Sequence, residues 1–488
     1  MAFPSPQGSG AVALPRPGSL ARATLPRPRP VAVRPSVALW VLVACCVAVV
    51  VVASAVPTNL VQGSRGLFPE WMAGPLHDVF AGPVQALIGR GGFSPDFSYA
   101  FSGLFLLMLA AYGLVLASAR MVSMRAIVIA IGAMYAVIAL SPQLELSDIF
   151  NYLGYARLGA LHGLNPYTHV IANEQFDPVS LFVSWHHWPS PYGPLFTLLT
   201  YPLGGLSLSA GYWIMKVAMV LLSAGFIALV WQCARQLGHD PRFPVLFVAA
   251  NPIMLIYEVA GFHNDPVMLV PAMAAISLLL ARRYKWAGAA LAVAIAVKFT
   301  AVLLLPFLMI AARPARRSLH VLVGVVAGGI PLAAASVAVF GFALPNAADQ
   351  STIVTALSVV NLVGVIFGLG GTTPGLEIAS KVALLAVAAA LVLAARRGRP
   401  GWLSGAGWAT LALLVCMSWF MPWYVSWALP LAALSLSPQL RRAALAFTAF
   451  AAITFLPLTG AVLADLHVNL MQGRPDVAAL HRLATLMH

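Results

Sequence analysis

The sequence predicts an all-α polytopic membrane protein, and three observations support this prediction. Of its 488 residues, 61% are hydrophobic and only 9% are charged, which is more apolar surface than a water-soluble domain buries. Apolar runs follow one another along most of the chain and are separated by polar links. Basic residues gather at the ends of these runs, as they do around membrane helices. The bilayer is therefore the expected solvent for most of the chain.

About thirteen runs are predicted to cross the bilayer as helices. They cover residues 37–56, 99–119, 126–142, 208–234, 243–259, 265–281, 286–298, 300–312, 319–341, 376–395, 403–419, 424–438 and 443–463. The runs 286–298 and 300–312 are short and meet at Lys298, and paired short segments often mark a binding site built from broken helices. The predicted transmembrane domain spans residues 37–463.

The charged residues predict the orientation of these helices. With the N-terminus in the cytoplasm, 20 of the 28 lysines and arginines fall in the N-terminal tail or in cytoplasmic loops. Of the 14 acidic residues, only Asp240 falls in such a loop. Residues 1–36 are interpreted as a disordered basic cytoplasmic tail, and residues 464–488 as a C-terminal tail on the outer face.

The outer face is predicted to carry the long loops, which are the expected place for any chemistry. They cover about residues 57–98, 143–207 and 342–375. Their tryptophan, tyrosine and proline content is typical of helices that lie in the membrane interface. We therefore expect interfacial helices on this face, together with the active site if the protein is an enzyme.

Several function classes are excluded by composition and motifs. The formal net charge of +14 lies at the ends of apolar runs, so it does not predict a nucleic-acid partner. The four cysteines lie inside predicted spans without metal-ligand spacing and imply no disulfide framework: Cys45, Cys46, Cys233 and Cys416. The glycine-rich residues 368–375 do not match a dinucleotide fingerprint. No cofactor is predicted, and no soluble domain is present for a nucleotide sugar.

A polar stretch between two apolar runs offers a carboxylate at the start of a short predicted helix. Residues 147–157 read Ser-Asp-Ile-Phe-Asn-Tyr-Leu-Gly-Tyr-Ala-Arg, and the dipole at a helix N-terminus favours a negative charge such as Asp148. Spacings of four and seven residues place Tyr152 and Tyr155 on the face of Asp148, and Arg157 follows. The pattern is typical either of a capped interfacial helix with an aromatic belt or of an active site.

A short polar turn and an intramembrane lysine are the next candidates. His263, Asn264 and Asp265 lie in a very short outer link between two predicted spans. Lys298 lies between two short apolar segments, where a cation costs about 2.5 to 3.5 kcal/mol at a helix centre. It is therefore expected either to reach the interface or to pair with an anion. The alternative for the link is a polar turn with no further role.

The outer loop 184–194 combines adjacent histidines with aromatic residues and prolines. His186 and His187 could ligate a metal, but no third ligand lies at a suitable spacing. No metal site is predicted here, and aromatic packing around a lipid or sugar is expected instead.

Taken together, these side chains suit transfer from a phosphorylated lipid. The Asp148 carboxylate can take the proton of an acceptor hydroxyl, while Arg157 and Lys298 can stabilise charge that develops on a leaving phosphate. A donor of this kind would reach the site from the bilayer.

A set of motifs in a fixed order resembles a known family. The matching stretches are residues 147–152, 163–167, 190–195, 251–252, 261–265, 297–298 and 422–424. In this order they resemble the bacterial polyprenyl-phosphate-mannose-dependent mannosyltransferases of the GT-C superfamily, particularly the alpha-1,6-mannosyltransferases of lipoglycan assembly. The resemblance covers about residues 140 to 435. It implies a GT-C-like bundle that transfers mannose, with inversion, from a polyprenyl-phosphate donor to an acceptor glycan or glycolipid on the outer face.

The resemblance also implies roles for single residues. Asp148 matches the catalytic aspartate of the family, which acts as general base. The motif positions expected to surround the donor phosphate or sugar are Arg157, His263, Asn264, Asp265 and Lys298. Tyr152 and Tyr155, which share the helical face of Asp148, are also expected to bind substrate. Many GT-C enzymes have paired acids at this point, whereas here Ser147 precedes Asp148 and the nearest second acid is Glu145. This departure puts metal dependence in doubt, and no bound cation is predicted.

Two other functions remain open at this stage. A secondary transporter or a lipid-linked sugar flippase is suggested by the number of spans and by the two short segments. Transporters usually place ionisable residues near the membrane midplane and contain an internal repeat, but the two halves of this chain show no obvious self-similarity. The third possibility is a non-catalytic subunit that only holds a partner enzyme. Such a subunit would not need the acidic, basic and histidine side chains described above.

Overall fold

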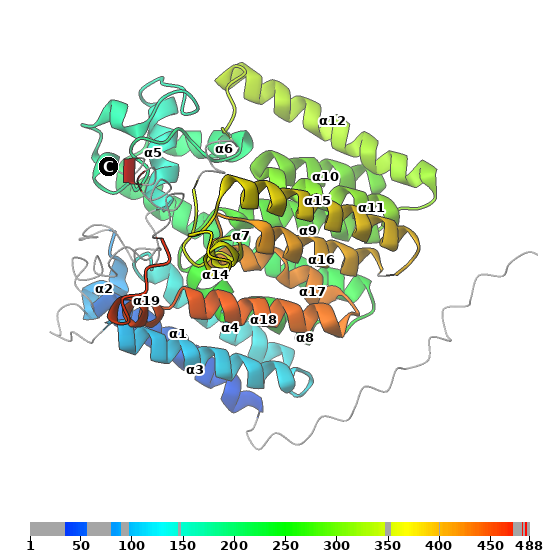
Figure 1. Ribbon diagram of the computed structural model, residues 1–488, viewed down its shortest axis with the longest axis horizontal. Coiled ribbons are helices and arrows are strands. Elements are labelled where there is room, and N and C mark those ends of the chain that lie inside the picture. The colour runs from blue at the N-terminus through cyan, green and yellow to red at the C-terminus, as the bar shows by residue number, and fades with distance from the viewer. Residues whose placement is uncertain are drawn as a thin grey trace, which may run out of the picture.

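The structure is a computed structural model that describes residues 35–55, 80–88, 97–144, 148–346, 353–399, 401–471, 481 and 484–485. Within these ranges every regular element is a helix (Figure 1). Nearly all of the predicted tail 1–36 lies outside the described residues, and so does most of the predicted tail 464–488. The prediction of an all-α protein is confirmed.

The first half of the chain contains the following helices, in which η marks 3-10 or π-helical turns. They are α1 (Pro35–Ala55), α2 (Gly82–Ile88), α3 (Phe97–Ala117), η3 (Ala119–Met121), α4 (Met124–Leu140), α5 (Asp148–Ala160), η4 (Ile171–Glu174), η5 (Pro178–Leu181), α6 (Pro194–Gly204), α7 (Leu208–Gln236), α8 (Arg242–Ala249) and η6 (Ile253–Val259).

The second half continues in the same way. Its helices are α9 (Asp265–Leu280), α10 (Tyr284–Val297), η7 (Phe299–Leu304), α11 (Leu305–Ala311), α12 (Ala315–Phe340), α14 (Val359–Ile366), α15 (Pro374–Arg396), α16 (Trp402–Cys416), η8 (Pro422–Trp427), α17 (Leu429–Leu434), α18 (Pro438–Thr454) and α19 (Pro457–Asp465).

Each predicted span coincides with a helix or a pair of helices. Among the described residues, five helices are long and apolar enough to cross a membrane, namely α1, α3, α7, α12 and α15. The bent pairs α8–η6 and α18–α19 raise this number to seven if each pair is one span. The other predicted spans fall on shorter helices. The chain is therefore a multi-pass membrane protein, while the number of thirteen spans and the orientation of the termini remain predictions.

Breaks in the helices have local causes. The Asn251 side chain accepts a hydrogen bond from the backbone N–H of Ile253 at 2.9 Å, and Pro252 supplies no N–H to continue α8. The chain therefore bends by 51° between α8 and η6. Pro457 stands at the corresponding bend of 57° between α18 and α19. Lys298 is extended, with φ −141° and ψ 117°, and separates α10 from η7.

Close packing of two backbones holds α10 in place. A Cβ added to Gly288 would lie 2.0 Å from the carbonyl oxygen of Val321, and one added to Gly324 would lie 1.9 Å from that of Lys285. Only glycine allows α10 and α12 to approach this closely. The crossing fixes the helix whose last turn leads to Lys298.

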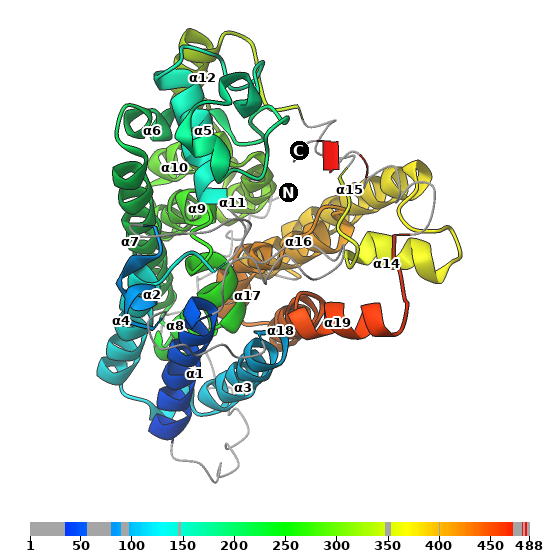
Figure 2. The same cartoon turned by 90° about the vertical axis from the view of Figure 1, so that its left-hand side faces the viewer.

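The helices form one bundle with an additional layer at one end. Figure 1 shows α5 and α6 at the left-hand end of the bundle, with α12 along the top. In the perpendicular view of Figure 2, α14, α15 and α19 lie on the side opposite α7 and α4. α5 packs on α6 and α7, and α1 packs on α3. The described part of the predicted outer loop 143–207, which contains α5 and α6, thus forms a helical layer at one end of the bundle.

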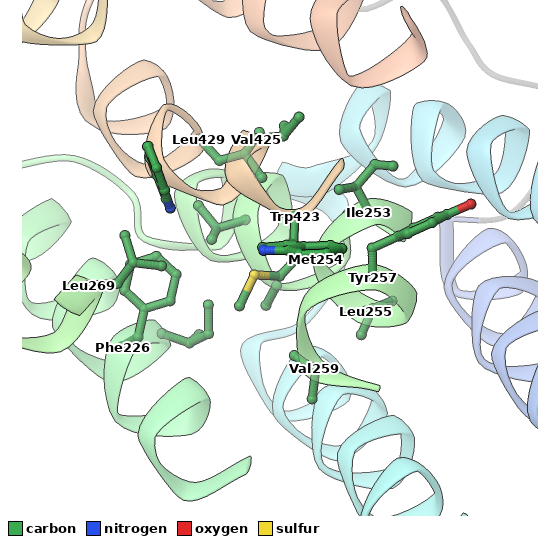
Figure 3. Close-up of a cluster of buried hydrophobic side chains, with 14 of the residues drawn as sticks. Phe226, Ile253, Met254, Leu255, Tyr257, Val259, Leu269, Trp423, Val425 and Leu429 are labelled. Carbon is green, nitrogen blue, oxygen red and sulfur yellow. The ribbon is translucent and has the colours of Figure 1, made fainter. Parts of the chain in front are cut away.

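The core beneath this layer is apolar. Figure 3 shows side chains of η6 packed between the neighbouring helices, with Met254 next to Trp423 of η8 and the Tyr257 side chain pointing away from Trp423. Ile253, Leu255 and Tyr257 are fully buried. Packing of this kind tolerates little displacement, so the turn that follows η6 has a fixed starting point.

Candidate active site

Asp148 lies at the first position of α5 and is the centre of a polar cluster, by which we mean Asp148, His263, Asp265 and Lys298. Its residue exposure is only 8%. One carboxylate oxygen accepts a hydrogen bond from the Asn151 amide at 3.2 Å and another from the Tyr192 hydroxyl at 3.4 Å. The other oxygen lies 3.1 Å from Nδ1 of His263. Two elements far apart in the sequence therefore meet at this carboxylate.

Asp148 remains ionised in spite of its burial. Burial by itself raises the pKa of the carboxyl group. The contact with His263 and the hydrogen bond from Asn151 lower it by more, so the pKa of Asp148 lies below its ordinary value. The helix N-terminus also favours the negative charge. A carboxylate in this state is available to accept a proton at neutral pH.

His263 is held by the turn between η6 and α9. Its ring is 1% exposed and stacks on the Trp423 indole with ring centroids 3.5 Å apart. Gly261 lies against the same ring, because a Cβ at this position would come within 2.5 Å of His263 Nε2. The ring is therefore confined from several sides. Its Nε2 atom has no hydrogen-bond partner among the described residues.

Asp265 and Lys298 form an ion pair next to this turn. The Lys298 ammonium lies 2.7 Å from Oδ1 of Asp265, which also accepts a hydrogen bond from the Trp427 indole. Asp265 is fully buried, whereas the Lys298 side chain is 19% exposed. The ammonium also lies 5.2 Å from the centre of the Tyr424 ring, within range of a cation–π interaction. The expected pairing of Lys298 with an anion is thus present in the structure.

The loop 190–194 reaches the same place from another side. A Cβ on Gly193 would lie 2.2 Å from the carbonyl oxygen of Val297, so the loop backbone lies directly on the end of α10. The neighbouring Tyr192 donates to Asp148. This contact joins the motif around Tyr192 to the segment that carries Lys298.

Asn264, Tyr152 and Tyr155 are close to the polar cluster, but the two tyrosine hydroxyls are already engaged. The Tyr152 hydroxyl accepts a hydrogen bond from the backbone N–H of Asn264 at 3.1 Å. The Tyr155 hydroxyl donates to the carbonyl oxygen of Trp188 at 2.6 Å. Both rings are buried. The tyrosines therefore hold the turn and the loop around Asp148. The side-chain nitrogen Nδ2 of Asn264 has no hydrogen-bond partner among the described residues.

The structure does not bring Arg157 to the polar cluster. Arg157 lies nine residues after Asp148 on α5, about 13 Å further along the helix axis. Its guanidinium pairs with Asp177 at 2.9 Å, and the same carboxylate lies 2.7 Å from Nε2 of His162. This pairing lowers the pKa of Asp177 although burial raises it. Arg157 thus fastens α5 to the segment 171–181, and its predicted contact with a donor phosphate has no support here.

Several residues at the site were not predicted. Asn151 bonds both to Asp148 and to the Ser184 hydroxyl, at 2.8 Å, and so ties the carboxylate to the loop 184–194. Glu258, predicted at an outer helix end, is fully buried in η6 and accepts a hydrogen bond from Ser426 at 3.2 Å. Trp423 and Tyr424 lie in a motif quoted for the family resemblance, which could have identified them. No sequence signal pointed to Trp427.

An apolar cleft opens beside Lys298. It is lined by residues of α9, η7, α16, η8 and α17, including Thr300 and Ala301, which lie two and three residues after Lys298. Trp427 lines this cleft, and the Lys298 ammonium lies 5.4 Å from the centre of the Trp427 ring. The polar cluster and an apolar cleft therefore share one wall.

The described residues contain no group of three or more histidines, cysteines or acids arranged to hold a metal ion. The second acid considered from the sequence, Glu145, lies outside the described residues, as does Ser147.

In the loop 184–194, Trp185 and Trp188 pack together with ring centroids 4.7 Å apart.

Two family models match most of the chain. The model described as alpha-(1->6)-mannopyranosyltransferase, N-terminal domain, matches residues 71–314, which is half of the chain. The model described as MptB C-terminal domain matches residues 352–472. The first match contains the whole polar cluster, and the second contains Trp423 and Trp427. A search of solved structures found no match.

Curated proteins of the same description are similar to this chain. Alpha-(1->6)-mannopyranosyltransferase A of Mycobacterium tuberculosis is 29% identical over 345 residues, 63% of this chain and 65% of the relative. Alpha-(1->6)-mannopyranosyltransferase B of Corynebacterium glutamicum is 27% identical over 355 residues, 62% of this chain and 57% of the relative. Each alignment covers less than two thirds of the relative. On the match of half its length to the family model, the chain belongs to the alpha-(1->6)-mannopyranosyltransferase family.

Proposed function

We propose that this protein transfers mannose from a polyprenyl-phosphate donor to a hydroxyl group of an acceptor glycan or glycolipid on the outer face of the membrane. Asp148 acts as the general base, and the reaction inverts the configuration at the anomeric carbon. The observation that carries the proposal is the buried, ionised carboxylate of Asp148, in contact with His263 and connected through one turn to the Asp265–Lys298 pair.

The proposed step balances in a simple way. The acceptor hydroxyl attacks C1 of the mannose, its proton passes to Asp148, and the bond between C1 and the phosphate oxygen breaks. The lipid phosphate leaves with the electron pair of that bond. Inversion of a β-linked donor gives an α-linked product, as the names of the relatives specify.

The side chains around the polar cluster support recognition of a phosphate. Lys298 supplies a partly exposed cation. Asn264 and His263 each have a buried nitrogen without a partner among the described residues, and such groups favour a ligand that satisfies them. Cations and hydrogen-bond donors in a site of this kind stabilise the charge that grows on a leaving phosphate.

The apolar cleft supports a donor that is carried by a lipid. Its wall includes Thr300 and Ala301, two and three residues after Lys298, and Trp427, whose ring lies near the Lys298 ammonium. A phosphate at Lys298 would place the attached chain at the entrance of this cleft. The cleft has a volume of about 40 Å³, so it would take only the part of an isoprenoid chain next to the phosphate, which its apolar walls suit.

The transport alternative is not favoured. The family match and the named relatives indicate mannosyl transfer.

The proposal is tested with Asp148→Asn. Asparagine keeps the size of the side chain but cannot accept the proton, so transfer from labelled polyprenyl-phosphate mannose should fall by about 10²- to 10⁴-fold. The matched control is Glu174→Gln, which makes the same change at a partly exposed acid outside the polar cluster. Undiminished transfer by Asp148→Asn would refute the assignment. Movement of the labelled lipid across vesicles without a glycan product would favour the flippase.

A further inference from the structure

A fully buried lysine that the proposed reaction does not use lies behind the polar cluster. Lys216 of α7 has no exposed surface. Its ammonium donates a hydrogen bond to the carbonyl oxygen of Ser141 at 2.5 Å. None of the ion pairs formed by the described residues includes it. Burial of an ammonium without a carboxylate partner is costly, so the surroundings that hold this charge need an explanation.

Three aromatic rings replace the missing carboxylate. The ammonium lies 4.2 Å from the centre of the Trp213 ring, 4.7 Å from that of Phe262 and 5.2 Å from that of Tyr212. These distances are within the range of cation–π interactions, which strengthen when the cation is removed from water. An apolar residue would fill the same space, but it would leave the Ser141 carbonyl without this donor.

Two of the groups that hold Lys216, the Ser141 carbonyl and the Phe262 ring, belong to separate segments that both lead to the polar cluster. Ser141 ends α4 and begins the connection to Asp148. Phe262 directly precedes His263. One ammonium therefore contacts the segment before the carboxylate and the segment before the histidine.

These two segments are also bonded to each other beside Lys216. The Gln143 side chain donates to the carbonyl oxygen of Gly261 at 3.1 Å, and the Leu144 N–H donates to that of Ala260 at 3.1 Å. Together with the Lys216 contacts to Ser141 and Phe262, these two hydrogen bonds form a brace around the turn that presents His263 to Asp148.

The turn needs such support because its backbone is strained. Phe262 has φ 54°, in the left-handed region that a bulky residue rarely adopts. Strained residues persist where the surrounding structure holds them. The ring of Phe262 is held on one face by the Lys216 ammonium.

We propose that Lys216 is a positioning residue, which clamps residues 141–144 after α4 to the η6–α9 turn and thereby keeps His263 in contact with Asp148. The inference rests on the proposed function, because the Asp148–His263 contact is used in that reaction. Lys216 itself does not touch the polar cluster, and its charge acts only through Ser141 and Phe262.

The test compares Lys216→Met with Lys216→Arg in the full-length protein in membranes or detergent. Lys216→Met should lower kcat by about tenfold or more, as expected for misplaced reacting groups, while the donor KM changes far less because Lys298 and Asn264 are untouched. The acidic limb of the rate profile should move to higher pH, since Asp148 loses part of the His263 contact. Lys216→Arg, which keeps the charge, should restore part of kcat.

Two controls keep the outcome interpretable. Lys381→Met makes the same change at an exposed lysine of α15, which is 57% exposed and paired with Glu377, and should leave kcat unchanged. Phe262→Leu keeps an apolar side chain but removes the ring under the ammonium, and should reproduce the pH shift in weaker form even if Lys216→Met is poorly folded.

Several results would overturn the inference. A Lys216→Met enzyme with wild-type kcat and pH profile would do so, and so would loss of thermal stability with unchanged kcat and pH profile per folded molecule, which would make Lys216 a stabilising residue only. Wild-type behaviour of Lys216→Met combined with an inactive Asp148→Asn would remove the positioning role and leave the proposed reaction standing. An active Asp148→Asn would instead remove the reaction itself.

Discussion

Gly261→Ala should displace His263 from Asp148 by the addition of one methyl group. The new Cβ would lie 2.5 Å from Nε2 of His263 and 2.6 Å from the carbonyl oxygen of Tyr257. Ordinary contacts begin at 3.4 Å, so the ring has to move by about 0.9 Å relative to this backbone. Trp423 stacks on the ring at 3.5 Å and leaves it little freedom. We therefore expect the 3.1 Å contact between His263 and Asp148 to be lost.

The expected size of the effect follows from this displacement. Misplacement of reacting groups by about 1 Å can lower a rate by about 10²-fold, and overpacking of a filled site costs about 1 to 3 kcal/mol of stability. The assay is transfer of labelled mannose from a polyprenyl-phosphate donor, with a thermal melt on the same preparation. Both quantities should fall, and the rate should fall by more than the loss of folded protein explains.

The matched control is Gly205→Ala at the end of α6. Gly205 has φ −81°, and a Cβ there meets nothing within 4 Å. It should keep the wild-type rate and melting temperature. If Gly261→Ala also keeps the wild-type rate and pH profile, the reasoning that His263 must sit against Asp148 is wrong.

Two further predictions test the electrostatics of the site and the lipid cleft. His263→Gln should raise the pKa of Asp148, because contact with His263 lowers it. Asp148 is then protonated, and lost as a base, at a higher pH, so the acidic limb of the kcat/KM profile moves to higher pH. An unchanged acidic limb would contradict the role of the contact. Ala272→Phe fills the cleft from α9 and should raise KM for long-chain donors but not for a short-chain analogue. Ala386→Phe on the exposed face of α15 is its control, and equal KM values for both variants would count against the cleft.

The helices were predictable because a segment that crosses the bilayer must be a long apolar run, and such runs are visible in the sequence. A helix satisfies its own backbone hydrogen bonds in lipid, so an apolar run in a membrane protein has little choice of structure. The bends in these helices depend on hydrogen bonds of single side chains, which the length and hydropathy of an apolar run do not show. The run 243–259 reads as one span, but Asn251 captures a backbone N–H and Pro252 withholds one, so the chain turns by 51°.

Part of the site was predictable for a related reason. Polar residues are few in this chain and costly in lipid, so those at the ends of apolar runs stand out. His263, Asp265 and Lys298 were expected near Asp148, and the structure places them there. The same signal was present at Lys216, a single charge inside the run 208–234, but only the structure shows what surrounds it.

Partners within loops were not predictable. Arg157 was expected to face a phosphate, but Asp177 and two backbone carbonyls occupy its guanidinium. Asp177 lies 20 residues further along an irregular segment, where no periodicity relates the two positions. Glu258 shows the same limit, because helical spacing does not reveal that η6 is packed on all sides.

The charge balance of the polar cluster explains why Lys298 can favour the transition state. In the structure its ammonium is paired with Asp265, at 2.7 Å, so part of its charge is already neutralised before any donor arrives. In the proposed reaction, the phosphodiester donor carries one negative charge, and the lipid phosphate that leaves gains a second as its bond to C1 breaks. Only an interaction that strengthens along this path accelerates the reaction. The Lys298 ammonium, which is 19% exposed, can interact with the phosphate in both states, and the increase in this interaction as the second charge develops is the part that accelerates the reaction.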